Sequence, residues 1–265
     1  LQPDWHLDHN QRVLLSHDDP LGEAFNNTRS QALEALVHFD LWVRRKRPDD
    51  PVPELFGILE QRLSEDASIP LTRPERALLG MHFGDLCLLD LTWSAKHHEL
   101  FFPKDQPDLA MDAFKTYLMF SRPAEQVFGI LRSTYAYAVE HLDDLQNAQG
   151  ETQEAVYHLS KHLLTLYLWG VCPLTGHESL LEGFYAQTQK DKSHWANLFE
   201  HLGRKLRHQK DPLPESVLER IRAFFAWRLA AAEPEELKRY SFWMEAEILD
   251  PQWRLEQYGS ILDLI

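Results

Sequence analysis

Apolar side chains recur at helical spacing along almost the whole of this 265-residue chain. The apolar segments are separated by short breaks rich in Pro, Asp and Gly, whereas the apolar–polar alternation of a half-buried strand is nearly absent. This pattern predicts an all-α protein. About a dozen helices are expected, over residues 28–46, 53–64, 74–89, 92–101, 107–120, 124–145, 152–170, 178–188, 193–209, 214–232, 235–247 and 251–264.

Several of these helices begin with recognisable capping residues. Thr28 with Gln31, and Thr72 with Glu75, fit the capping box, in which a hydroxyl group and the side chain three residues later satisfy free amide groups. Asp250 stands directly before a proline at the start of the last apolar segment, so it is the expected cap of that helix.

The spacing of the segments indicates a repeat protein. Read in pairs, the first helices begin about 41 residues apart on average, within the range of HEAT and armadillo repeats. A single helix pair leaves its apolar face open, and stacked pairs bury it in one continuous core. The sequence therefore predicts an α-solenoid of about six antiparallel helix pairs, a HEAT/armadillo-like superhelix. Residues 28–265 are expected to form this single domain, and residues 1–27 are expected to be an irregular lead-in or linker.

Aromatic residues recur at comparable places within the segments, at residues 39–42, 166–169, 224–227 and 240–243. Large aromatic side chains at helical spacing usually fill the space between neighbouring helices. A ligand-binding pocket would also need convergent polar groups, and none is evident near these runs. We therefore expect the aromatic runs to pack in the core of the repeats.

The charge balance limits the partners that the chain can bind. Its 41 acidic residues against 27 Lys and Arg give a formal charge of -14. This charge repels nucleic-acid phosphates and anionic lipids unless basic residues gather on one face. Generic nucleic-acid binding is therefore disfavoured.

The cysteines and the apolar runs indicate the compartment. Cys87 and Cys172 lie among aliphatic neighbours, as buried thiols of a reducing compartment do. The longest apolar runs, such as residues 163–169, are too short to span a bilayer, and the N-terminus resembles no signal peptide. A cytoplasmic protein without membrane association is expected. The chain begins at Leu1 rather than at Met, which suggests a fragment of something longer.

No catalytic or cofactor-binding residue is assigned, because the chain has no Walker A loop, no dinucleotide-binding glycine pattern and no nucleophile elbow. Glu154, His158 and His162 form the strongest metal candidate, since helical spacing turns them the same way. The catalytic glutamate of the zinc-protease motif is missing, and no further ligand is identifiable. A solvated helix face is the favoured interpretation, and no metal or other cofactor is expected.

The only dense basic run is Arg44, Arg45, Lys46 and Arg47, at a predicted helix end. Cations at a helix C-terminus interact favourably with the exposed carbonyl groups and the helix dipole, and this is the favoured interpretation. Contact with a polyanion or with an acidic protein partner is the alternative. A second, looser basic group spans residues 204–210.

Several segments resemble the C-terminal helical region of large bacterial STAND-type NTPases associated with antiphage defence (AVAST-like). The resemblance is carried by residues 26–36 (NNTRSQALEAL), 197–204 (NLFEHLGR), 226–237 (AWRLAAAEPEEL) and 242–243 (FW). It implies a sensor arm, in which a helical array recognises a foreign protein and an ATPase and effector outside this chain respond. No catalytic residue is implied here.

Three hypotheses follow. The leading one is a non-catalytic scaffold or sensor that binds a protein partner, such as a phage protein, as the recognition arm of a larger STAND-like NTPase. The alternative is an independent scaffold, or a nucleic-acid-binding helical repeat that uses Arg44–Arg47. The third is an all-helical metal-dependent hydrolase built on Glu154, His158 and His162. The oligomeric state is left open.

Overall fold

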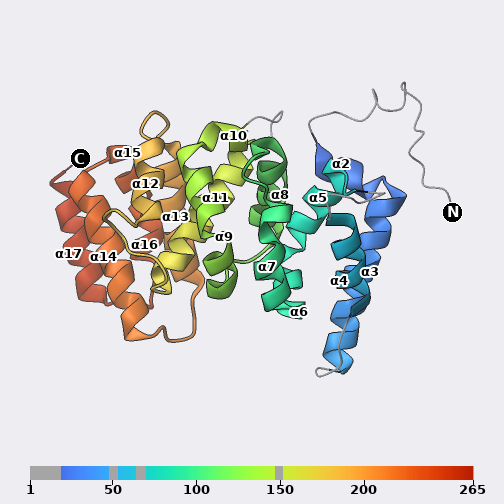
Figure 1. Cartoon of the computed structure of the whole chain (residues 1–265). Coiled ribbons are helices and arrows are strands. Elements are labelled where there is room, and N and C mark those ends of the chain that lie inside the picture. Colours follow the sequence, from blue (N-terminus) through green and yellow to red (C-terminus); the bar gives the residue numbers. More distant parts are fainter. Residues whose placement is uncertain (1–18, 48–52, 64–69, 147–151, 265) are drawn as a thin grey trace. The chain divides into compact units, whose positions relative to one another are not determined.

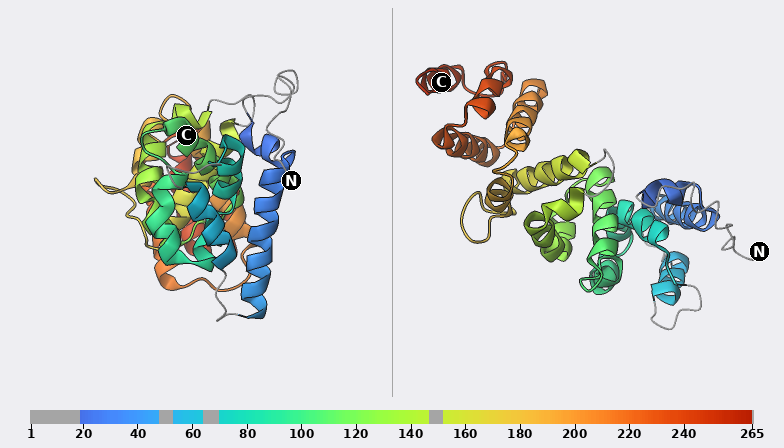
Figure 2. Two further views of the ribbon diagram at one scale, coloured as in Figure 1. Left: turned by 45° about the vertical axis from the view of Figure 1, so that its right-hand side comes forward. Right: turned by 90° about the horizontal axis from the view of Figure 1, so that it is seen from above.

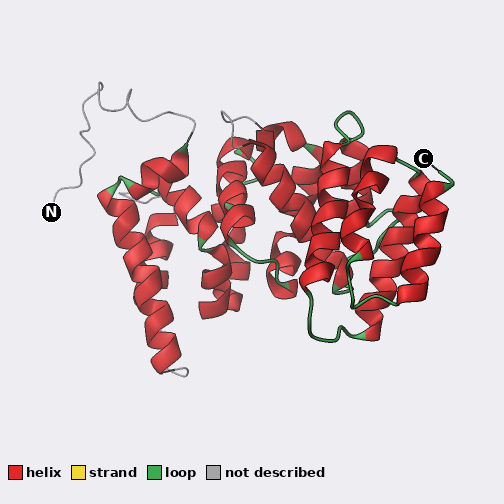
Figure 3. Ribbon diagram, turned by 180° about the vertical axis from the view of Figure 1, so that it is seen from behind, coloured by secondary structure: helices red, strands yellow, loops and turns green. Residues whose placement is uncertain are grey.

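The computed structural model describes residues 19–47, 53–63, 70–146 and 152–264 (Figure 1). Every regular element in these residues is a helix, and no strand occurs among them (Figure 3). The predicted all-α class is confirmed. The chain divides into two compact units, Leu1–Val156 and Tyr157–Ile265.

The first unit contains α2 (Pro20–Phe25), α3 (Thr28–Lys46), α4 (Pro53–Leu63), α5 (Arg73–Met81), α6 (Phe83–Leu89), α7 (Leu91–Phe101), α8 (Pro107–Phe120), α9 (Glu125–Glu140) and α10 (Leu142–Gln146). Helix α11 (Thr152–Leu168) crosses from the first unit into the second. The second unit continues with α12 (Leu180–Gln187), α13 (Ser193–His208), α14 (Glu215–Ala231), α15 (Pro234–Leu237), η1 (Lys238–Tyr240), α16 (Ser241–Met244) and α17 (Pro251–Leu262).

Three of the predicted helices are divided in the structure. The segment 74–89 forms α5 and α6, which meet at His82, and the segment 124–145 forms α9 and α10. The segment 235–247 forms α15, η1 and α16. Apolar periodicity continues across each junction, which is why the sequence pattern does not reveal these breaks.

The expectation of an irregular lead-in is wrong for residues 20–25, which form α2. Asp19 caps this helix by accepting a hydrogen bond from the Gly22 amide at 2.8 Å, and Pro20 occupies the first turn. Helix α2 then packs on α5. Residues 1–18 of the predicted lead-in lie outside the described residues.

The capping predictions have mixed outcomes. The capping box at Thr72 is confirmed, and Asp250 caps α17 through the Trp253 amide at 2.8 Å. The box predicted at Thr28 is wrong, because Asn27 is the cap and accepts hydrogen bonds from the next two amides after Thr28. An Asn side chain caps as well as Thr does, and its position one residue earlier decides the outcome.

The core of the first unit is built around α5, which packs most extensively on α8. The two backbones approach closely at Gly80, where an added Cβ would lie 2.1 Å from the Ala113 carbonyl oxygen. One turn away, the Thr116 hydroxyl donates to the Ala77 carbonyl oxygen at 2.6 Å. Small residues thus allow a contact that longer side chains would prevent.

A buried carboxylate joins the start of α5 to two further helices. The Glu75 side chain is inaccessible to solvent and accepts hydrogen bonds from Arg29 of α3 at 3.2 Å and from Arg62 of α4 at 2.7 Å. The same carboxylate accepts the Thr72 hydroxyl and amide at 2.8 Å. Glu75 therefore fixes three helix ends at one point.

Helices α3 and α4 run side by side in opposite directions (Figures 1 and 2). Helix α6 also lies along α3. Glu34 in the first half of α3 faces His82 at the start of α6, and Arg44 in the last turn of α3 donates to the Leu89 carbonyl oxygen at the end of α6. The two helices are therefore parallel, and one side of α3 is covered.

The second unit has its own core around α13. The Trp243 indole donates to the Phe199 carbonyl oxygen at 3.0 Å and stacks on the Phe199 ring at a centroid distance of 4.8 Å. Gly203 provides the space, since an added Cβ would lie 2.6 Å from the indole ring. Phe225 of α14 meets the same indole edge-on at 5.2 Å.

A buried ion pair joins α14 to α15. Arg228 and Glu236 form hydrogen bonds of 2.7 to 3.0 Å, and both side chains are buried. The rings of Tyr185 and Trp227 lie 4.0 and 4.7 Å from the guanidinium carbon. Between the helices the chain turns at Ala232, whose φ of 51° is left-handed. Each unit thus has a hydrophobic core of its own. The stacking of six helix pairs into a superhelix remains a prediction.

We predict that Gly80→Ala destabilises the protein by about 1–3 kcal/mol, because the new methyl group must push α5 and α8 apart. The matched control is Gly129→Ala, a glycine inside α9 with open space around its Cα. It should stabilise by about 0.5–1 kcal/mol, as alanine does in an exposed helix. Urea unfolding measures both changes. Equal stabilisation by the two variants would contradict the close approach.

We also predict that His201 makes the protein acid-sensitive. Burial, and then the positive charges of Lys161 and Lys205 with His158, lower the pKa of His201 to about 4. In the unfolded chain the His201 imidazole takes up a proton near pH 6.5, whereas in the folded protein the same imidazole stays neutral at that pH. The free energy of unfolding should therefore fall between pH 6.5 and 4.

Urea unfolding at several pH values compares the parent protein with two variants. His201→Gln should show a shallower loss of stability below pH 6.5, because the substituted side chain takes up no proton. The control is His208→Gln, at an exposed position on the same helix. A slope for His201→Gln that equals that of the parent would rule out this origin.

Candidate functional site

The most distinctive surface of the first unit is the outer side of α3. Ser30, Leu33, Val37 and Asp40 of this helix are buried. On the other side Phe39 and Trp42, one turn apart, are 53% and 57% exposed. Their rings stack on each other at a centroid distance of 6.1 Å. Two large aromatic rings are thus held together in solvent.

The basic run, for which a partner contact is the alternative interpretation, lies at the end of the same helix. Arg44 is partly buried and donates to the Leu89 carbonyl oxygen at 2.7 Å, so it joins α3 to α6. Arg45, Lys46 and the C-cap residue Arg47 are exposed. Their place in the last turn fits the predicted interaction with the helix dipole.

Together, Phe39, Trp42, Arg45 and Lys46 define what we call the α3 surface. It combines exposed aromatic rings with cations at one end of a helix. Leu88 of α6 is 71% exposed and lies next to the residue whose carbonyl binds Arg44. An exposed leucine therefore lies one residue from the contact between α6 and the end of α3.

These exposures correct part of the aromatic prediction. Phe224, Tyr240 and Trp243 are buried, as expected of core residues, whereas Phe39, Trp42 and Trp169 are more than half exposed and are not. Helical spacing is the same in both cases. What differs is the side of the helix that other helices cover, and that depends on tertiary packing.

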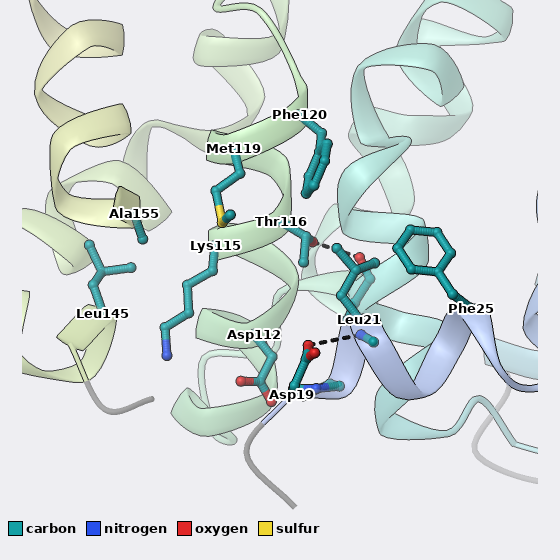
Figure 4. Close-up of a pocket in the computed structure, with 13 residues that line it drawn as sticks. Asp19, Leu21, Phe25, Asp112, Lys115, Thr116, Met119, Phe120, Leu145 and Ala155 are labelled. Atoms are coloured by element: carbon teal, nitrogen blue, oxygen red, sulfur yellow. Dashed lines mark hydrogen bonds between the residues drawn. The ribbon is translucent and has the colours of Figure 1, made fainter. Parts of the chain in front are cut away.

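A pocket of about 280 Å³ lies between α2, α5 and α8 (Figure 4). Leu21 and Phe25 line one side of it, with Asp19 and Asp112 at one end. Its polar groups already serve the fold, because Asp19 caps α2, Asp112 pairs with Arg73, and Thr116 bonds to backbone carbonyl groups. These three polar side chains are therefore committed to the fold, and apolar side chains line the rest of this part of the pocket.

Lys115 is the remaining polar residue of this pocket. Burial lowers the pKa of Lys115, and the neighbouring Asp112 carboxylate opposes that shift. The carboxylate of Asp112, on the same helix, balances the positive charge of Lys115. This pairing does not by itself mark an active site.

The three side chains of the predicted metal candidate on α11 differ in their exposure to solvent. Glu154 is exposed, and His158 is half-buried with its Nε2 atom 3.4 Å from the Lys161 Nζ atom. His162 is only 3% exposed. The preferred interpretation of these residues as a solvated helix face is therefore wrong for His162, which the helix turns inward.

A different group brings metal-ligating atoms together. Within the described residues, one set of three such side chains has its ligand atoms within 4.8 Å of one another, namely Glu34, His38 and His82. Glu34 and His38 show the i,i+4 spacing that sequence analysis can detect. Their proximity to His82 depends on the packing of α6 along α3, for which the sequence gives no signal.

The remaining predicted groups serve the structure. In the second basic group, Arg204 pairs with Glu200 and Arg207 pairs with Glu245, at 2.7 and 2.6 Å. Both cysteines are buried thiols, as predicted. Burial raises the pKa of Cys87 to about 11, so this thiol stays protonated at neutral pH.

Comparison with protein-family models, with curated proteins and with solved structures finds no match to this chain. Among the described helices, none has the length and apolar character that a membrane span requires.

We predict that Trp42→Gln leaves the free energy of unfolding within about 0.5 kcal/mol of the parent, because the indole is mostly in solvent. The contrasting variant is Trp243→Ala, at a fully buried indole, which should cost about 3–5 kcal/mol. Urea unfolding distinguishes the two. A large loss from Trp42→Gln would show that this ring belongs to the core.

Proposed function

We propose that this chain is a non-catalytic recognition module that binds a protein partner through the α3 surface. The observation that carries the proposal is the exposed, stacked pair of Phe39 and Trp42 beside Arg45 and Lys46. Aromatic residues and arginine are the residue types that supply most of the binding energy at protein interfaces. Exposed aromatic rings otherwise lower solubility, so a partner that covers them accounts for their presence.

The charge of the chain indicates the chemistry of that partner. The protein carries a formal charge of -14, yet the end of α3 presents three exposed cations in sequence, Arg45, Lys46 and Arg47. A partner segment with apolar side chains flanked by acidic ones matches the rings and the cations together. The acidic remainder of the chain would repel the same segment elsewhere, which restricts binding to this surface.

The resemblance to the C-terminal region of STAND-type NTPases supports a specific context for this binding. In that context the chain is the recognition arm of a larger defence protein, the partner is a phage protein, and ATP hydrolysis belongs to another domain. The reading frame of the gene tests the context: a Walker A segment upstream is expected. Its absence would remove the NTPase context and leave the proposed binding surface in place.

Site-specific photo-cross-linking tests the surface itself. A benzophenone amino acid is placed at Trp42 of the full-length protein, and cells are irradiated with and without phage infection. The matched control carries the same amino acid at Lys96, an exposed residue of α7 in the same unit. We expect a cross-linked protein specific to position 42 in infected cells, lost when Phe39→Ser is added.

Each outcome of that experiment has a distinct meaning. Identical products from positions 42 and 96 would overturn the α3 surface as the binding site. A host protein specific to position 42 would keep the surface and reject the antiphage context. Cross-linked nucleic acid, with an affinity for duplex DNA or RNA that falls steeply with salt, would establish the nucleic-acid alternative instead.

A further inference from the structure

His82 presents an unusual buried nitrogen atom. It stands at the junction of α5 and α6, and its side chain is 7% exposed. The Nδ1 atom lies 2.9 Å from the Asp85 Oδ2 atom and forms a hydrogen bond with it. The Nε2 atom is buried and has no hydrogen-bond partner among the described residues.

The unpartnered atom faces two other side chains that can bind metal. Nε2 of His82 lies 3.9 Å from the Glu34 Oε1 atom, and Nε2 of His38 lies at the same distance from that oxygen. The two imidazole rings meet edge-on at a centroid distance of 5.2 Å. Two imidazole nitrogens and one carboxylate oxygen therefore converge between α3 and α6.

The hydrogen bond to Asp85 determines what His82 can do there. A carboxylate only accepts, so the Nδ1 atom of His82 carries the hydrogen in the neutral ring. Nε2 is then left with a lone pair that no donor satisfies. An imidazole that donates one nitrogen to a carboxylate and offers the other as a lone pair is the usual form of a metal-binding histidine.

We propose that Glu34, His38 and His82 bind one divalent transition-metal ion, with Asp85 as the outer carboxylate that orients His82. Two imidazoles and one carboxylate form a ligand set that zinc and iron(II) both use, and zinc is the ion that we test. Tetrahedral zinc holds its ligand atoms about 3.4 Å apart, so separations of 3.9 Å to the Glu34 oxygen, and of at most 4.8 Å within the set, close with modest side-chain movements. The His38 side chain is 61% exposed and is free to move inward.

The site has a structural and a chemical consequence. Its ligands come from α3 and from the α5–α6 junction, so a bound ion cross-links the helix that carries the α3 surface to its neighbour. Three protein ligands leave a further coordination position for water or for a group from another molecule.

Metal binding is measured on the full chain after removal of metal with a chelator. Zinc is titrated in competition with an indicator dye, and cobalt(II) is added as a spectroscopic probe of nitrogen and oxygen ligands. We expect one zinc ion per chain, visible cobalt absorption bands, and a zinc-dependent rise in the melting temperature.

Two variants and one control locate the site. His38→Ala, at an exposed position, should weaken zinc binding at least tenfold, and Asp85→Asn should weaken it by about 10–100-fold through the lost orientation of His82. His141→Ala removes another exposed histidine of the same unit and should change nothing. Circular dichroism of the metal-free proteins confirms that each variant folds.

The competing explanation is that the contacts of His82 with Glu34 and Asp85 serve only the packing of α6 on α3, without metal. It predicts no stoichiometric zinc in the parent protein, or equal zinc affinities for the parent, His38→Ala and His141→Ala. Either result would overturn the proposed site.

Discussion

The close approach of α5 and α8 is the contact on which the first unit depends. Gly80 lies against the Ala113 carbonyl group, and the neighbouring Thr116 hydroxyl bonds to the backbone of α5. Helices that touch through their backbones cannot slide or rotate freely, because any displacement creates an overlap or a void. With α5 fixed, the buried Glu75 carboxylate fixes α3 and α4 through Arg29 and Arg62.

The exposure of the α3 surface follows from the contacts that fix α3 against α5 and α6. Arg29 and Arg44, near the two ends of α3, are tied to Glu75 and to the end of α6, so one side of α3 is committed to the core. The opposite side, with Phe39 and Trp42, is then left in solvent whatever its hydrophobicity. A rigid helix presents side chains with little loss of entropy when a partner binds, which favours its use for recognition.

The sequence predicts where the helices begin and end far better than it predicts which helices pack against one another. The bounds of α3 follow directly from apolar periodicity, and the Thr72 capping box is a local signal of the start of α5. The exposure of Trp42 and the burial of His162 depend instead on which helix covers which side. The meeting of His38 with His82 likewise rests on the packing of α6 along α3, between residues far apart in the chain.

The ion pair of Arg228 with Glu236 also bears on how the second unit folds. The two residues are separated by only eight positions, so the loop that joins them closes at small entropic cost. The left-handed turn at Ala232 and the contact of Arg228 with the neighbouring Trp227 ring form within the same local segment. Burial of Arg228 or Glu236 without its partner would leave an uncompensated charge, so the ion pair is expected to form before water is excluded. The turn between α14 and α15 is therefore expected to form early, ahead of the long-range contact between Trp243 and Phe199, and to act as a folding nucleus for this unit.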